Sequence, residues 1–217
     1  LFGNIIQLLP YIMLSIDMLE ARGLGRRVQD HHSLRGRFTV KRVESCNLFS
    51  GEQQTIYEAG KPLVGMPTLA ITDTTVQTRA ATLSEERVTL TFLTPTRLRE
   101  QDRLVKYAEF RPLIYRLLER FMSLDRTYGA GCGMDAQQQQ QLIESVEQVR
   151  CLEDSTHWEE VSSFSRRQQR FMPISGLRGR ATFTGNLAPF RELLVWGEVM
   201  HVGKSCVKGN GWYKIEA

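Results

Sequence analysis

The fold prediction rests on the stretch PISGLRGRATFTGNLAPFRELLVWGEVMHVGKSCVKGNGWYKI, residues 173–215, which forms the end of a domain. Polar and apolar side chains alternate over 177–184, which predicts a strand. The apolar spacing then changes to that of a helix over 187–199, with Asn186 as its expected cap. A final strand is predicted at 209–216. The stretch therefore ends as strand, helix and strand.

Upstream segments complete the pattern of one domain. A strand is predicted at 87–93 and an amphipathic helix at 110–124, and Asp135 is expected to cap an additional helix that runs to about residue 151. Two more strands are predicted at 157–165 and 170–174. With one strand more than the four of the fold, this order is that of an α+β, ferredoxin-like βαββαβ domain with one inserted helix. Right-handed crossovers then place the helices on one face of the sheet and leave the other free.

The residues before this domain predict a smaller set of elements. Apolar residues recur at helical spacing over 4–22, and Gly23 and Gly25 are expected to end that helix. The segment 37–44 alternates as a strand. The segment 46–85 predicts a short hairpin, with a strand at 55–58, and a connecting segment.

Composition and charge restrict function only weakly. The chain has 217 residues, of which 41% are hydrophobic and 24% are charged, and its net charge is +4. These values are ordinary for a soluble globular protein. Basic residues gather in 22–42, 97–126 and 166–214, which is compatible with a polyanionic partner. A solvated surface of mixed charge explains them as well.

Cysteine spacing and the start of the chain exclude several classes. The four cysteines form no Cys-x-x-Cys pair, so a zinc site is not expected, and reduced thiols in a cytoplasmic protein are the simplest interpretation. Polar residues within 1–19 fit neither a lipid-spanning helix nor a signal peptide, so no membrane association is expected. The initial Leu1 leads us to expect that upstream sequence is missing.

A glycine-rich segment near the end carries the most informative chemistry. It contains Gly203, Lys204, Lys208, Gly209 and Gly211. Glycines let backbone amides approach a phosphate closely, and such amides can form an anion-binding nest. Lysines beside them add positive charge for the same oxygens. A tight connection into an ordinary edge strand is the alternative interpretation.

This region partly resembles two nucleotide-binding motifs but matches neither. A P-loop has four residues between its first glycine and Gly-Lys-Ser, whereas five separate Gly197 from Gly203. The segment 208–215 partly resembles the RNA-binding strand motif of RRM domains, but its third position is Asn210 rather than an aromatic residue. We expect Tyr213 to be buried and leave open whether the neighbouring tryptophan stacks on a base.

The same segment resembles the C-terminal signature of the CRISPR repeat-processing endoribonucleases of the RAMP superfamily. That signature combines a glycine-rich strand, a helix, a small-residue segment with His, Gly and Lys, and a terminal Gly-x-Gly-x-Tyr strand. The matching residues are Gly176, Gly179, Gly185, Gly197, His201, Gly203, Lys204, Gly209, Gly211 and Tyr213. Residues 88–99 resemble the first strand of that domain, and 1–30 resemble the end of a preceding RAMP domain. The resemblance is weakest over 46–85.

The resemblance implies an organisation and an activity. Residues 1–85 would be the remnant of a first RAMP domain with a connecting hairpin, and 86–217 a C-terminal RRM-like RAMP domain. Such proteins cut precursor CRISPR RNA at its repeats without a metal or cofactor and leave a 2′,3′-cyclic phosphate. The implied partners are CRISPR repeat RNA and other CRISPR-associated proteins in antiviral defense. The family's usual catalytic histidine lies upstream of Leu1.

Among the residues present, His201 and Lys204 are the candidates for catalysis. His201 would act as acid or base, with Lys204 stabilising the negative charge that develops on the phosphate. A structural histidine that closes the helix and bonds a backbone carbonyl is the alternative. His31 and His32 lie in a polar loop, and His157 receives no role.

A second group of candidates would bind RNA. The glycine-rich segment supplies Gly203, Lys204, Lys208, Gly209 and Gly211. Arginines on the predicted hairpin and the strand after it would contact phosphates of an RNA stem. They are Arg166, Arg167, Arg170, Arg178 and Arg180.

Three functions remain open from sequence. The first is a repeat-cleaving endoribonuclease, and the second is a non-catalytic RAMP subunit that holds CRISPR RNA in an effector complex. The third is a ferredoxin-like interaction module without a nucleic-acid ligand. RNA binding that weakens steeply with salt separates the third from the others.

Overall fold

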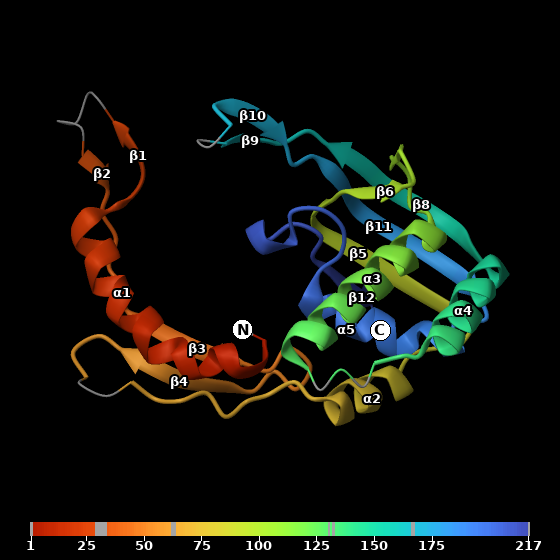
Figure 1. Ribbon diagram of the computed structural model, residues 1–217, viewed down its shortest axis with the longest axis horizontal. Helices are drawn as coiled ribbons and strands as arrows, with labels where there is room; N and C mark the ends of the chain where they lie inside the picture. The colour runs from red at the N-terminus through yellow and green to blue at the C-terminus, as the bar shows by residue number, and fades with distance from the viewer. Residues whose placement is uncertain are drawn as a thin grey trace. The chain divides into compact units, whose positions relative to one another are not determined.

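The computed structural model describes residues 2–28, 34–61, 64–129, 131, 133–165 and 168–216 (Figure 1). The chain forms two compact units, Leu1–Thr72 and Asp73–Ala217. The expected domain division at residues 85 and 86 stays a prediction; by compactness, helix α2 (Asp73–Ala81) groups with the second unit. None of the described helices is both long and apolar enough to cross a membrane.

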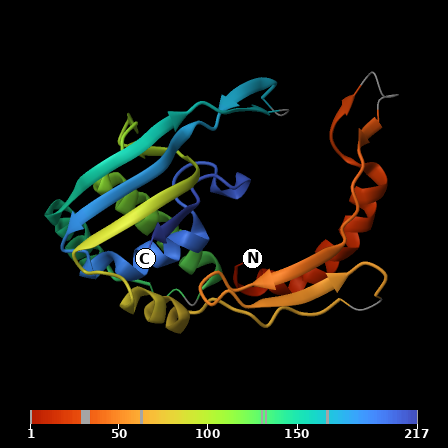
Figure 2. The same ribbon diagram turned by 180° about the vertical axis from the view of Figure 1, so that it is seen from behind.

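The first unit combines one helix with two antiparallel hairpins (Figure 2). Its elements are η1 (Gly3–Leu8), α1 (Leu9–Arg22), β1 (Leu24–Val28), β2 (Leu34–Gly36), β3 (Arg42–Cys46) and β4 (Gln53–Glu58). Leu9 and Met13 of α1 pack with Ile56 of β4 in a small buried cluster. The predicted strand at 37–44 is wrong before Arg42, because the Val40 N–H donates to the Glu20 carboxylate of α1 over 2.6 Å instead of pairing with a strand.

The second unit is built on a four-stranded antiparallel sheet. Its sheet strands are β5 (Arg87–Thr96), β8 (Val149–Glu159), β11 (Gly176–Gly185) and β12 (Tyr213–Glu216). Two short hairpins are β6 (Leu98–Glu100) with β7 (Arg103–Val105), and β9 (Ser162–Ser165) with β10 (Arg170–Pro173). The other helices are α3 (Phe110–Tyr128), α4 (Ala136–Ser145), η3 (Val146–Gln148), η4 (Ala188–Phe190), α5 (Arg191–Met200) and η5 (Cys206–Lys208).

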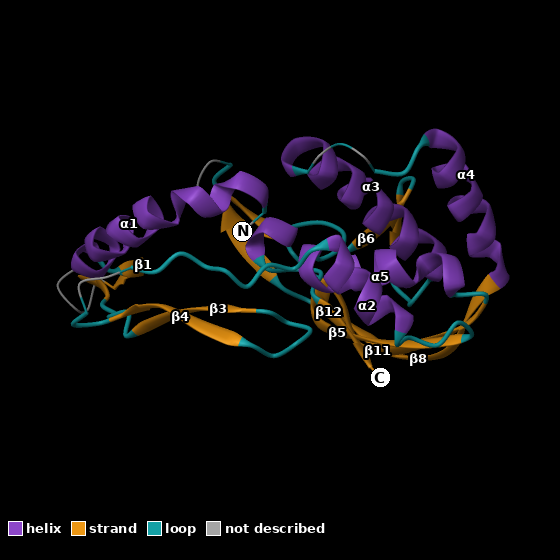
Figure 3. Ribbon diagram, turned by 90° about the horizontal axis from the view of Figure 1, so that it is seen from below, coloured by secondary structure: helices purple, strands orange, loops and turns teal. Residues whose placement is uncertain are grey.

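The strand order confirms the predicted ferredoxin-like class. Across the sheet the strands run β12, β5, β11, β8, which is fourth, first, third, second in chain order. This is the arrangement that a split βαβ pair produces. Figure 3 shows α3, α4 and α5 together on one face of the sheet, as the crossover rule predicts.

Aromatic side chains close the core between the sheet and these helices. The ring centroid of Phe110 lies 5.2 Å from that of Phe183 and 5.1 Å from that of Phe190. Tyr213 is fully buried, as predicted, and its hydroxyl donates to the Leu194 carbonyl over 2.7 Å. A Cβ at Gly197 would lie 2.0 Å from the Tyr213 hydroxyl. The Gly197 and Tyr213 positions of the family signature therefore fit one another in the core.

Several predicted boundaries are corrected. The extra helix, whose Asp135 capping box with Gln138 is present, ends at Ser145, and β8 begins at Val149. The sequence predicts only the end of this strand, from residue 157, because β8 is an edge strand exposed on both faces over most of its length and lacks alternation. The last strand begins at Tyr213 rather than 209. Asn186 is not a cap, since its side chain bonds Gln148.

Candidate nucleic-acid interface

The glycine-rich connection, residues 201–212, joins α5 to β12 by folding back on itself. The Val202 N–H donates to the Gly211 carbonyl over 2.9 Å, and the Gly211 N–H donates to the Pro95 carbonyl over 3.2 Å. The Lys204 N–H donates to the Arg97 carbonyl over 3.0 Å. These bonds fix both arms of the connection, near Lys204 and near Gly211, to the end of β5 and the residue after it.

The glycines of this connection are required for different structural reasons. A Cβ at Gly211, where φ is +77°, would lie 1.9 Å from the Val202 carbonyl oxygen, and one at Gly203 would lie 2.5 Å from that of Arg97. Close backbone approach therefore requires both. Gly209 has open space around it, although its φ of +89° also favours glycine. The N–H groups of Gly209 and Gly211 already donate within the protein, so their predicted contact with RNA stays a prediction.

His201 occupies a strained position at the end of α5. Its φ of 62° and ψ of 168° belong to a region that non-glycine residues rarely adopt. The imidazole Nδ1 lies 3.2 Å from the Asn210 carbonyl, and the ring stacks on Trp212 with centroids 6.1 Å apart. A carbonyl can only accept, so Nδ1 carries the proton and Nε2 the lone pair of the neutral ring. Burial lowers the pKa of His201 below 6.5, which favours that neutral form.

A basic hollow of about 280 Å³ lies against the glycine-rich connection. Gly203 and the exposed Lys204 line it from the connection. The residues that line it from the β5–β6 junction, β6 and α3 are Arg97, Arg99, Arg116, Glu119, Arg120, Ser123 and Leu124. Five cationic side chains therefore surround this space with a single carboxylate.

Backbone carbonyls hold the arginines of the basic hollow in place. Arg116 Nε donates to the Arg99 carbonyl over 2.8 Å, and Arg120 Nε donates to the Met200 carbonyl over 2.5 Å. Arg97 Nη1 donates to the Ser175 carbonyl over 3.3 Å. Among the described residues only Arg116 of these five cations has a carboxylate partner, Glu119 at 2.7 Å. Such fixed guanidinium groups with unused donors match the oxygens of a phosphate.

Comparison with known families identifies the chain. A family model described as CRISPR-associated endoribonuclease Cas6 matches residues 90–213, more than half of the sequence. The chain belongs to the Cas6 family. This confirms the family resemblance and the class of function that follows from it, a CRISPR RNA-processing endoribonuclease. A second model, described as an N-terminal domain, matches residues 1–69.

Solved Cas6 structures share the fold. A Thermus thermophilus Cas6 superposes with a TM-score of 0.52 at 17% identity, over 77% of this chain and 67% of its own. Its product complex superposes with a TM-score of 0.53 at 17% identity, over 78% and 64%. The chain thus spans about two thirds of the length of these relatives. Among proteins of curated function, no significant match was found.

Sequence reasoning missed the arginines of the Cas6 chain's basic hollow. Arg97 lies at the β5–β6 junction and Arg99 on β6, on either side of Leu98, and Arg116 and Arg120 are one helical turn apart. The basic run 97–126 was noticeable, but its members come from two elements that meet only in the folded unit. The spacing of Arg116 and Arg120 by one helical turn was the sequence feature that could have indicated this site.

Of the predicted hairpin and strand arginines, the three that the structure describes do not line the basic hollow. Arg166 and Arg167 lie outside the described residues. Arg170 is exposed, and its Nε donates to the Gln168 side chain over 3.0 Å. Arg178 and Arg180 are exposed on β11 and pair with Glu159 at 3.2 Å and Glu216 at 2.6 Å. Their contact with RNA stays a prediction.

Proposed function

We propose that this Cas6 chain binds CRISPR repeat RNA through the basic hollow and cleaves it beside the glycine-rich connection. The observation that carries the proposal is the excess of cations in the hollow, where five positive side chains face one carboxylate. Uncompensated like charges that converge on one space repel one another, and a bound polyanion relieves that repulsion. RNA supplies such an anion as its phosphodiester backbone.

Two properties of the basic hollow favour RNA phosphates over other anions. Guanidinium groups present paired donors that fit phosphate oxygens, and the carbonyl contacts of Arg116 and Arg120 limit their movement before a ligand arrives. The exposed Lys204 and Lys208 extend the positive charge along the glycine-rich connection. This elongated distribution suits a chain of phosphates rather than one small anion.

The proposed reaction is an internal transesterification. The 2′-hydroxyl loses its proton to a base and attacks the adjacent phosphorus, while the bond from phosphorus to the 5′-oxygen breaks and that oxygen takes up a proton. The products are a 2′,3′-cyclic phosphate and a 5′-hydroxyl. Neutral His201, with its Nε2 lone pair, has the tautomer that a base needs. Lys204 would stabilise the negative charge of the phosphorane, and no acid is assigned.

Labelled repeat RNA incubated with the protein in EDTA tests the proposal. We expect one discrete cut and a 3′ end that resists phosphatase until acid opens the cyclic phosphate. Lys204→Ala should weaken binding, with Lys61→Ala on the first unit as a control. Random degradation would contradict the proposal. Binding without cleavage would instead support the non-catalytic role, which the family assignment does not favour.

A further inference from the structure

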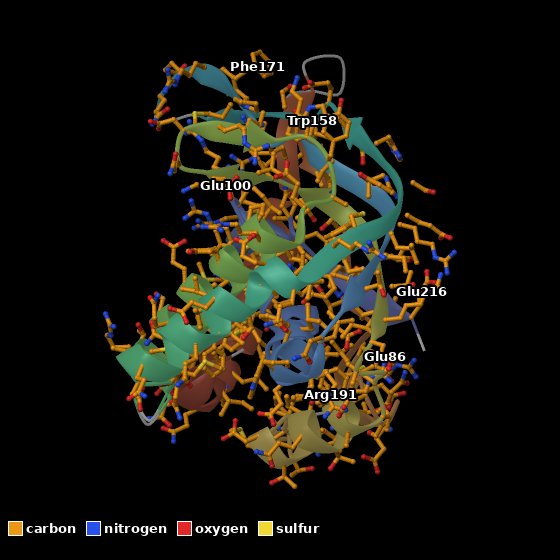
Figure 4. The ribbon with its side chains drawn as sticks, turned by 90° about the vertical axis from the view of Figure 1, so that its right-hand side faces the viewer. Glu86, Glu100, Trp158, Phe171, Arg191 and Glu216 are labelled. Carbon is orange, nitrogen blue, oxygen red and sulfur yellow. The ribbon has the colours of Figure 1, made fainter. Side chains whose placement is uncertain are left out.

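The hairpin formed by β9 and β10 exposes a pair of aromatic rings. Phe164 and Phe171 are directly opposite each other in its register, so both lie on one face of the ribbon. Their ring centroids are 5.3 Å apart at 68°, yet the residues remain 48% and 70% exposed. In Figure 4 the label of Phe171 lies at the top of the picture, just above that of Trp158. Two large apolar rings are therefore open to solvent at one place.

The sequence around the pair is basic. The sequence from Val161 to Ser175 contains Arg166, Arg167 and Arg170 and no acidic residue. Of these arginines the structure describes Arg170, which is exposed and adjacent to Phe171. An apolar protein partner has no need of such one-sided charge, whereas nucleic acid presents flat bases and an anionic backbone together. Charge complementarity thus favours RNA as the occupant.

The base of this hairpin is joined to the proposed RNA site. Arg97 of the basic hollow donates to the Ser175 carbonyl over 3.3 Å, and its guanidinium lies 5.7 Å from the Trp158 ring centroid. Asn210 of the glycine-rich connection donates its side-chain amide to the Ile174 carbonyl over 2.8 Å. These contacts hold the base of the hairpin against residues of the basic hollow and of the glycine-rich connection.

We propose that Phe164 and Phe171 stack on unpaired bases of the RNA whose backbone the basic hollow holds. This rests on the proposed function and adds the kind of nucleotide that the hairpin takes, because a base-paired stem leaves only its terminal pair free to stack. A cross-strand aromatic pair also stabilises a two-stranded ribbon. Stabilisation of the ribbon does not account for a ring that leaves most of its surface in water.

Two stem-loop RNAs with the same stem test the proposal. One is blunt, and the other carries unpaired flanks with 2-aminopurine, whose fluorescence falls on stacking. We expect Phe171→Ala to lower affinity for the flanked RNA by about 5-fold to 100-fold and to abolish the quenching, since one stacked base contributes on that scale. The loss of affinity for the blunt RNA should be smaller, because fewer of its bases are free to stack, and Phe171→Trp should restore both signals.

Tyr107→Ala is the matched control, because Tyr107 is 72% exposed and lies outside the hairpin. Equal losses on both RNAs, or unchanged quenching, would overturn the proposal. A change in molecular mass by light scattering without any effect on RNA would overturn it too and indicate a protein-binding surface. If no RNA binds the wild-type protein, the proposed function itself fails, which is a distinguishable result.

Discussion

The backbone N–H of Lys204 donates to the carbonyl of Arg97 over 3.0 Å. This bond joins the glycine-rich connection to the basic hollow. The connection can be recognised in the sequence, whereas the hollow cannot. Lys204 and Arg97 both line that hollow, so a single site contains the family signature and the unneutralised arginines. The proposed function depends on this contact between the two segments.

Exchange of two glycines for alanine separates the cost of steric overlap from the cost of backbone strain. We expect Gly211→Ala to destabilise the protein by about 3 kcal/mol or more, because its Cβ would overlap the Val202 carbonyl at 1.9 Å. Gly209→Ala meets no atom within 4 Å and should cost only the strain of its positive φ, about 1–2 kcal/mol. Chemical denaturation measures both. Equal losses would contradict the close approach at Gly211.

Two substitutions at His201 distinguish a strained functional residue from a structural one. Glycine suits the observed φ of 62°, whereas alanine keeps the strain, so His201→Gly should be more stable than His201→Ala by about 1 kcal/mol or more. Both should cleave repeat RNA about 100-fold more slowly or worse, as expected when a base is lost.

The control for these variants is His157→Ala, an exposed histidine of β8. Its cleavage rate should equal that of the wild type. Undiminished cleavage by His201→Gly would remove the imidazole from the reaction and leave it as the helix-closing histidine.

Glu198 gives stability a pH dependence. Its carboxyl group is buried, Oε1 accepts from the Ile215 N–H over 2.8 Å, and no described residue hydrogen-bonds Oε2. Burial raises the pKa of Glu198 above its ordinary value of 4.5. The folded protein therefore binds this proton more tightly than the unfolded chain, and stability falls as pH rises from about 4.5 through the raised pKa.

Glu198→Gln should remove this dependence. Urea unfolding measured between pH 4 and pH 8 should show the variant gaining stability relative to the wild type as the pH rises. A constant difference across the range would mean that Glu198 does not titrate differently in the two states.

The parts of the fold that sequence predicted are those with strong local patterns. The face of α3 around Leu117, the capping box at Asp135 and the burial of Tyr213 follow from spacing and residue type. The part of the edge strand β8 before residue 157 was not predicted, because neither of its faces is regularly buried. The basic hollow could not be predicted, because Arg97 and Arg120 are brought together only by tertiary packing. No local periodicity in the sequence encodes such a contact.

The salt dependence of repeat-RNA affinity tests the central claim most directly. The measurement compares the wild type with Arg99→Gln, Arg120→Gln and the control Arg87→Gln, whose arginine is exposed on β5 and does not line the hollow. We predict that each hollow variant reduces the slope of log K against log salt by about 0.7–0.9 for every phosphate that the protein no longer neutralises, while the control leaves the slope unchanged. Slopes identical to the wild type in both hollow variants would contradict the assignment of this hollow to RNA.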